Sequence, residues 1–239
     1  MSIASVVSFR SGRWTGLLAS LAVLAVLGGT AAATTVYQVD DGTGDVVLGV
    51  SGGGDLLWLN GFTVVPGAEN ITSIQVAFGH AKFPAGSSFM ALLYQGADGS
   101  GNPNNGVTLL SSAGGVVAAI PNDTFQTVDI ADSIVSGKFF AGILVTHEAN
   151  QFPAYFDTSS SAGVSWVAVG LAGTINPASP SGFNNMTVYG PAFAGNFMLR
   201  AEGESLNGAV PEPLTILALG AGVGSLGAYI RRRRLRAIV

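Results

Sequence analysis

The sequence contains no cysteine among its 239 residues. This absence excludes disulfide bonds, a thiolate nucleophile and zinc held by cysteine. A domain without disulfides depends on its core, and the stretch 34–210 is long enough to bury a sizeable one. We therefore expect one domain that is stabilised by packing alone.

Basic residues are scarce in the middle of the chain. Between Thr34 and Val210 only Lys82, Lys138 and Arg200 are basic, against thirteen acidic residues, so this stretch has a formal charge of −10. The whole chain carries −4 because most of its basic residues lie near the two ends. An acidic body is a poor match for nucleic acid or an anionic membrane surface, and we expect no nucleic-acid partner.

Motifs of catalysis are also missing. His80 and His147 are the only histidines, and each follows an alternating apolar run, so we interpret both as surface or loop residues. No G-x-S-x-G elbow is present, and His147-Glu148 lacks the second histidine of H-E-x-x-H. The sequence predicts no enzyme and no cofactor; a hydrolase would require acids or histidines that gather in one cleft.

Glycine, in contrast, is abundant, with 34 residues and no collagen period. Short runs with a period of two alternate with Gly, Asn, Ser and Pro, and no stretch of the body sustains a helical period. This pattern predicts an all-β domain, an antiparallel β-sandwich that is jelly-roll-like. The expected strands include Val36–Val39, Val46–Val50, Leu56–Val65, Ile74–Phe78, Phe89–Leu93, Val107–Leu110, Val116–Ile120, Phe125–Ile130, Phe139–Val145, Ala154–Phe156, Ser165–Val169 and Phe197–Ala201. The expected loops include Ser159–Gly163 and an exposed one at Asn176–Asn185.

The N-terminus has the pattern of a secretory signal peptide. Arg10 and Arg13 precede the apolar run Leu17–Leu27, and small residues follow up to Ala33. We expect cleavage between Ala33 and Thr34, which makes residues 1–33 a signal peptide whose apolar run is helical.

The C-terminus carries a short apolar segment with a basic end. Leu214–Ile230 contains seventeen residues without a charge. Such a helix is about 25 Å long, slightly short of a hydrocarbon core of about 30 Å. It is followed by a basic stop made of Arg231, Arg232, Arg233, Arg234 and Arg236. This pattern predicts a transmembrane helix at 214–230 with a cytoplasmic C-terminus.

Immediately before this helix stands Pro211-Glu212-Pro213. The motif, the apolar run and the arginines together, over about 210–236, resemble the PEP-CTERM sorting signal of Gram-negative bacteria. The resemblance implies export through the Sec translocon and processing by exosortase, a membrane protease, near the motif. It also implies an inner-membrane intermediate with its body in the periplasm, and delivery to the cell surface or the exopolysaccharide matrix. The alternative is an ordinary single-span anchor with incidental prolines.

The body is similar to a common ectodomain of the same PEP-CTERM proteins. The similarity rests on Trp58–Phe62, on Ile71–Ile74 and on Asn196–Ala201. It implies a sandwich and no particular activity. The chain then divides into residues 1–33 (signal peptide), 34–203 (sandwich), 204–210 (linker) and 211–236 (sorting segment).

Two acidic stretches are candidates for calcium binding. Asp40, Asp41 and Asp45 lie in a glycine-containing loop, and carboxylates in such loops are the ligands that calcium prefers. A weaker candidate surrounds Asp98. Neither stretch has EF-hand spacing, and Asp-Gly is also typical of tight turns, which we favour at both places.

Aromatic side chains leave a second ligand open. Trp58, Tyr94, Tyr155, Trp166 and Tyr189 would form a sugar-stacking platform if they were exposed. The apolar surroundings of Trp58 and Trp166 favour the core instead. The leading hypothesis is therefore a structural or adhesive protein of the cell surface or exopolysaccharide matrix, and the alternative is a carbohydrate-binding module of that matrix.

Overall fold

A computed structural model describes residues 34–79, 83–189 and 194–206 of the chain. The signal peptide 1–33, the sorting motif, the helix expected at 214–230 and the arginines after it lie outside the described residues, as do His80 and Lys82. In the described part no helix is long and apolar enough to span a membrane.

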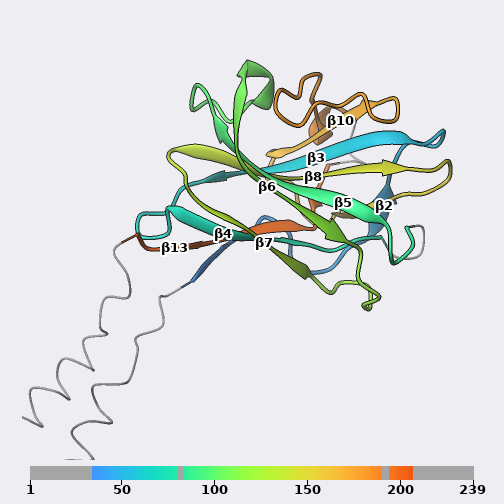
Figure 1. Ribbon diagram of the computed structural model, residues 1–239, viewed down its shortest axis with the longest axis horizontal. Helices are drawn as coiled ribbons and strands as arrows, with labels where there is room; N and C mark the ends of the chain where they lie inside the picture. Colours follow the sequence, from blue (N-terminus) through green and yellow to red (C-terminus); the bar gives the residue numbers. More distant parts are fainter. Residues whose placement is uncertain (1–33, 80–82, 190–193, 207–239) are drawn as a thin grey trace, which may run out of the picture. The chain divides into compact units, whose positions relative to one another are not determined.

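Every strand pairing in the described ranges is antiparallel, and the strands form two main sheets that face each other (Figure 1). The six-stranded sheet has the order β11 (Asn184–Asn185), β10 (Ser165–Gly170), β3 (Gly54–Thr63), β8 (Lys138–His147), β5 (Ser88–Gly96) and β6 (Val107–Val116). The four-stranded sheet has the order β1 (Thr35–Tyr37), β13 (Leu199–Glu204), β4 (Asn70–Val76) and β7 (Gln126–Ile134). A small third sheet has the order β12 (Asn196–Phe197), β9 (Ala154–Asp157) and β2 (Val46–Leu48). Two short 3₁₀ helices, η1 (Pro103–Asn105) and η2 (Met186–Tyr189), complete the described elements. The predicted all-β, sandwich-like fold is confirmed.

The strand pairs are nested along the chain. Strands β5 and β6 form a hairpin, β4 pairs with β7 around it, β3 pairs with β8 around that pair, and β2 pairs with β9 outermost. Apart from the β5–β6 hairpin, successive strands of this set lie in different sheets, so residues far apart in sequence become neighbours.

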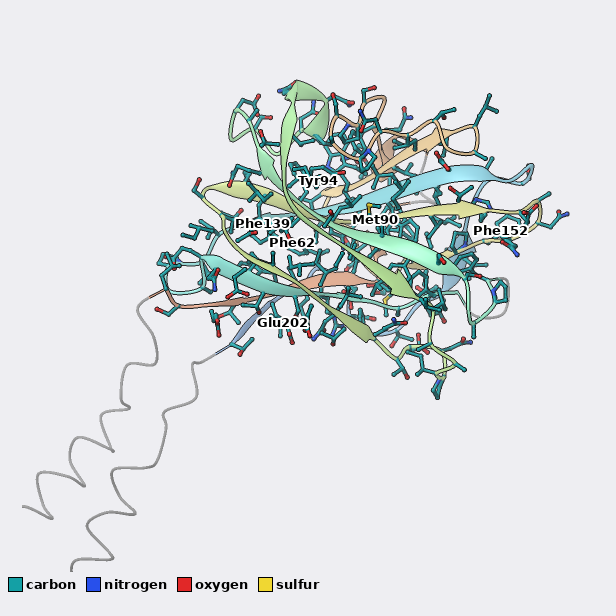
Figure 2. All side chains as sticks on the ribbon, in the orientation of Figure 1. Phe62, Met90, Tyr94, Phe139, Phe152 and Glu202 are labelled. Atoms are coloured by element: carbon teal, nitrogen blue, oxygen red, sulfur yellow. The ribbon has the colours of Figure 1, made fainter. Side chains whose placement is uncertain are left out.

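The main core lies between the two large sheets. Alternate residues of each strand point inward, as the period of two predicts. Phe62 and Phe139 meet there with ring centroids 5.5 Å apart, and both lie between the sheets in Figure 2. Tyr37, from the first strand, packs edge-on against Phe139 at 5.0 Å. The fully buried residues of this core include Trp58, Ile71, Ile74, Val76, Phe78, Ile143, Phe156, Phe197 and Leu199.

The other face of the six-stranded sheet is apolar too. Leu57, Leu59 and Leu92 lie there in a second cluster with Tyr94 and Phe140. This explains why Leu56–Leu59 is a continuous apolar run rather than an alternating one. Loop 171–183 is fastened to this side, where the Tyr94 hydroxyl donates a 2.8 Å hydrogen bond to the Pro177 carbonyl.

Asp55 fixes the start of that loop. Its carboxylate accepts hydrogen bonds from the backbone N–H groups of Gly173 (3.0 Å) and Ile175 (2.9 Å), and from the Thr146 hydroxyl (2.6 Å). Burial alone would raise the pKa of Asp55, but these bonds to the ionised form outweigh it, so the pKa lies below its ordinary value. Asp55 is therefore an ionised anchor for the loop.

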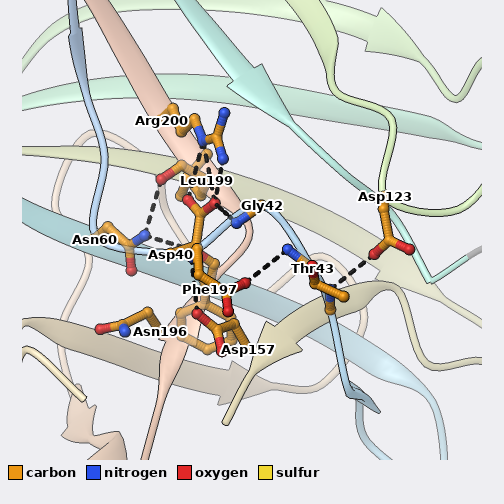
Figure 3. Close-up of polar contacts among 12 residues, drawn as sticks. Asp40, Gly42, Thr43, Asn60, Asp123, Asp157, Asn196, Phe197, Leu199 and Arg200 are labelled. Carbon is orange, nitrogen blue, oxygen red and sulfur yellow. Dashed lines mark hydrogen bonds and ion pairs between the residues drawn. The ribbon is translucent and has the colours of Figure 1, made fainter. Parts of the chain in front are cut away.

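Asn60 is a polar residue in the middle of the main core, and it holds the point where the chain passes from β12 to β13. Its Nδ2 donates to the carbonyls of Phe197 (2.8 Å) and Leu199 (2.9 Å), which flank that point (Figure 3). Its Oδ1 accepts a 2.7 Å bond from the Ser165 hydroxyl. Since every polar atom of this buried amide is satisfied, it joins β3 and β10 to the last strands.

Most expected strands are present, and three details differ. The prediction of a strand at Val116–Ile120 is wrong, because β6 runs from Val107 and ends at Val116. Part of the loop expected at Asn176–Asn185 is a strand, since Asn184 and Asn185 pair with β10. Strand β13 extends to Glu204, one residue into the expected linker, because it pairs with Asn70 there.

Replacing Asn60 by leucine should lower the free energy of unfolding by about 2–4 kcal/mol, because it leaves two buried carbonyls without a donor. The measurement is urea unfolding of the full chain in detergent. The exposed Asn184, whose amide makes only a 3.4 Å contact with Gly182, provides the control Asn184→Leu. Equal losses in the two variants would contradict the role of Asn60.

The anchor at Asp55 predicts an acid-dependent loosening of loop 171–183. Because the pKa of Asp55 is lower in the folded chain than its ordinary value of 3.8, the ionised carboxylate stabilises the fold fully at a pH above 3.8. This stabilisation is lost as the pH falls through the folded-state pKa. The stability advantage of the natural chain over Asp55→Asn should therefore be present at pH 6 and shrink below about pH 4.

Hydrogen exchange gives the local readout for the same change. At pH 6 the amide of Ile175 should exchange faster in Asp55→Asn than in the natural chain, while the amide of Ile143 inside β8 should not change. A constant stability difference across the acid range would show that Asp55 is not the anchor.

Candidate functional site

The predicted calcium candidate Asp40 is a buried member of an ion pair. Arg200 Nε lies 3.1 Å from both carboxylate oxygens, and its Nη2 also donates to Oδ1 (Figure 3). The Arg200 guanidinium stacks over the Phe125 ring with Cζ 3.8 Å from the centroid. This carboxylate is therefore engaged in holding the 40–45 loop against β13.

Asp41 and Asp45 connect the same loop to the segment after β9. Asp41 accepts bonds from the Thr43 N–H (2.8 Å) and the Ser159 hydroxyl (3.0 Å). Asp45 Oδ2 accepts from the N–H (2.7 Å) and hydroxyl (2.8 Å) of Thr158, and these bonds lower the pKa of Asp45. The three candidates thus make separate contacts within turns and between loops.

The second acidic stretch is a turn as well. Asp98 accepts from the N–H (3.0 Å) and hydroxyl (2.7 Å) of Ser100 and from the Asn105 amide (2.6 Å). Across the described ranges, no group of three or more histidine, aspartate or glutamate side chains is placed to hold a metal ion.

His147 is buried at the end of β8, so the prediction of a surface residue is wrong for it. Its Nε2 accepts a 3.3 Å bond from the Val50 N–H, and its Nδ1 lies 2.9 Å from the Glu148 carbonyl. These contacts assign the proton to Nδ1. The ring is covered because the loop before β3 folds over the strand end, a non-local contact that alternation does not predict.

The aromatic residues form core rather than a platform. Trp58 has no exposed surface, which confirms the core interpretation for it, and Tyr94 is fully buried as well. Trp166 is half-buried in the second cluster, and Tyr155 is buried. The large apolar side chains exposed in the described ranges are all aliphatic. The side chain of Tyr189 lies outside the described residues.

A hollow of about 460 Å³ lies where β5 begins and β8 ends. Its apolar lining consists of Phe83 and Phe89, which are buried, and Met90 and Leu144, which are half-buried. Met90 and Tyr94 lie along the same strand in Figure 2. The polar lining consists of Ser87, Ser88, Thr146, Glu148 and Gln151. This size is in the range of small-molecule sites.

Several polar groups of this hollow make no hydrogen bond with a described residue. Thr146 donates to Asp55, but no described residue makes a hydrogen bond with the hydroxyls of Ser87 and Ser88 or with the Glu148 carboxylate. Sequence reasoning missed these residues, because two serines and a glutamate at a strand start and a strand end form no motif.

A second hollow of about 450 Å³ lies beside Tyr155 and is lined by Asp45, Val46, Val47, Gly79 and Asn122. Burial raises the pKa of the Tyr155 phenol, and the negative charges of Asp123 and Asp45 add to the effect. The phenol is therefore protonated at neutral pH and is able to donate a hydrogen bond.

The chain matches no protein-family model and no curated protein sequence. Its fold is similar to the crystal structure of the cysteine protease and lectin-like domains of Cwp84, a surface layer associated protein of Clostridium difficile. The two share 15% sequence identity with a TM-score of 0.50 over 72% of this chain and 36% of that one. The matched part is thus about a third of the length of the Cwp84 chain.

Removal of the Arg200 guanidinium should leave Asp40 buried without its cation. Arg200→Met should lower the free energy of unfolding by about 2–4 kcal/mol, because an uncompensated buried charge is strongly unfavourable. The control is Lys138→Met, since the Lys138 ammonium makes only an exposed 2.6 Å bond to the Thr63 hydroxyl. Equal urea midpoints for Arg200→Met and the natural chain would refute the structural role of the pair.

Proposed function

We propose that this chain is an exported protein of the cell envelope, whose sandwich serves as a structural or adhesive component of the cell surface or exopolysaccharide matrix. The observation that carries the proposal is the succession of three features in the C-terminal sequence. Pro211-Glu212-Pro213 is followed by the uncharged run 214–230 and then by the arginines from Arg231 onward. In this proposal the Sec translocon exports the chain, and exosortase recognises and processes the tail.

The two ends of the sandwich lie side by side, which is compatible with a proposed signal at each end of the chain. Thr35 is the second residue after the expected cleavage site. It pairs with Gly203 near the end of β13. The N-terminal strand and the strand that leads to the tail are therefore adjacent at one sheet edge.

The interior also supports a non-enzymatic role. Both faces of the six-stranded sheet are packed, and the buried polar residues Asn60, Asp40 and His147 are engaged in structural contacts. A histidine whose two nitrogens bind backbone groups is not placed to act as a base. The proposed role is therefore one of surface contact rather than of chemistry.

Carbohydrate binding is a second candidate function. The nesting of the strand pairs supports the expected jelly-roll arrangement, an architecture that includes lectin domains. The Cwp84 structure to which this fold is similar includes a lectin-like domain. A fold does not carry a function by itself, so this candidate depends on a site in the sandwich, and the hollow between β5 and β8 offers one.

The sorting signal is tested by replacing Pro211-Glu212-Pro213 with three alanines. The natural chain should lose its tail and reach the outer fraction, whereas the variant should keep its full length in the inner membrane. Immunoblots of cell fractions report both size and location. Pro84→Ala, which alters an exposed proline of the sandwich, is the control. An unchanged size and location in the triple variant would rule out processing at this motif.

A further inference from the structure

We propose that the hollow between the start of β5 and the end of β8 binds a neutral saccharide. This inference rests on the carbohydrate-binding candidate for the function and adds the site and the ligand class. In this site Met90 and Leu144 contact the apolar C–H face of a sugar ring. Glu148, Gln151 and the serine hydroxyls bind its hydroxyl groups.

The lining has the two kinds of surface that a sugar ring requires. A pyranose presents C–H groups on its faces and hydroxyl groups around its edge. The half-buried side chains of Met90 and Leu144 provide an apolar floor from two paired strands, since these residues are partners in the register. Around this floor, Ser87, Ser88 and Glu148 offer donors and a charged acceptor.

The polar side of the hollow is fixed before a ligand arrives. Gln151 Oε1 accepts a 3.0 Å bond from the Glu148 N–H, and the Gln151 N–H donates to the Glu148 carbonyl at 3.2 Å. His147 holds the same carbonyl, and the Asn150 N–H bonds to the Ser51 carbonyl at 3.1 Å. The turn 148–151 is therefore braced, which reduces the ordering that binding would require.

This bracing also orients the Gln151 amide. Because Oε1 is engaged by the turn, the NH₂ group is the part of the amide available to a ligand. The Glu148 carboxylate accepts hydrogen bonds and the Gln151 amide donates them, so together they suit neighbouring hydroxyls, each of which both donates and accepts. His147 acts here as a positioning residue through its contact with the Glu148 carbonyl.

The negative charge of the described lining favours a neutral ligand over an anionic one. No basic side chain is among the described residues that line the hollow, and Glu148 supplies one negative charge. The body around it carries −10. Phosphorylated or acidic saccharides would meet repulsion from the Glu148 carboxylate, whereas neutral hydroxyls bind well to it.

Affinity electrophoresis of the full chain tests the proposal. The chain is solubilised in a detergent without a sugar headgroup and run in native gels that contain dextran, mixed-linkage β-glucan, galactomannan or acidic alginate. Migration should be slowed in at least one neutral gel and not by alginate. A chain that no polysaccharide slows would remove the carbohydrate-binding function together with this site.

Matched variants locate the site. Ser88→Trp should fill the hollow and abolish the retardation, and Glu148→Gln should raise the dissociation constant about tenfold, because a bond to a charged acceptor is lost. Asn122→Trp, which enters the second hollow, should leave the retardation unchanged. Urea unfolding verifies that each variant is folded, and Glu148→Gln, which preserves shape, decides the outcome if Ser88→Trp does not fold.

Three outcomes would overturn the site while leaving carbohydrate binding intact. These are equal retardation of Glu148→Gln and the natural chain, loss of retardation in Asn122→Trp alone, and retardation by alginate alone. The second outcome would move the site to the hollow beside Tyr155.

Discussion

The buried amide of Asn60 is the interaction on which the closure of the sandwich depends. It binds the carbonyls on both sides of the point where the chain leaves the small sheet and enters the four-stranded one. An unpaired carbonyl at that depth would be unfavourable, so this residue specifies where the last strand begins. The stretch Trp58–Phe62 supplies the amide, Asn196–Ala201 supplies its acceptors, and Ile71–Ile74 pairs with the same last strand. The three stretches on which the expected resemblance to an ectodomain rests are therefore parts of one structural unit.

Much of the fold could be predicted from the sequence, because a sandwich buries alternate residues and turns require glycine. The inward positions of β5 and β8 followed from the period of two alone. The errors have a common physical origin. The apolar residues after Val116 do not continue β6, because its partner β5 begins at Ser88, which pairs with Val116. Asn184 and Asn185, in contrast, are polar and become a strand because β10 offers a free edge. Pairing of this kind is decided by tertiary contacts rather than by local propensity.

The candidate site could not be predicted, for a different reason. The two segments that meet in the hollow, Ser87–Met90 and Leu144–Gln151, are brought together by the pairing of β5 with β8. Neither segment contains a recognisable motif. The proposed saccharide site consists of ordinary polar side chains, and only their arrangement in space distinguishes it. The acidic loop near Asp40 is the opposite case, a site candidate in the sequence that the structure does not support. Its composition suggests a ligand, but its carboxylates are engaged by Arg200, Thr158 and Ser159. Composition records which groups are present, and only the fold shows which of them are unengaged.

The distribution of charge links the fold to its proposed surroundings. Of the three basic residues between Thr34 and Val210, Arg200 is held between Asp40 and Phe125, Lys138 bonds to the Thr63 hydroxyl, and Lys82 lies outside the described residues. Acidic residues therefore outnumber cations among the described residues, where the Lys138 ammonium keeps its charge because its partner is a neutral hydroxyl. We expect a body with a formal charge of −10 to be repelled by acidic polymers at low salt. For the proposed adhesive role, contacts with neutral hydroxyl groups therefore suit this domain better than contacts with anions, and the hollow with one carboxylate, an amide and hydroxyls over an apolar floor offers such contacts.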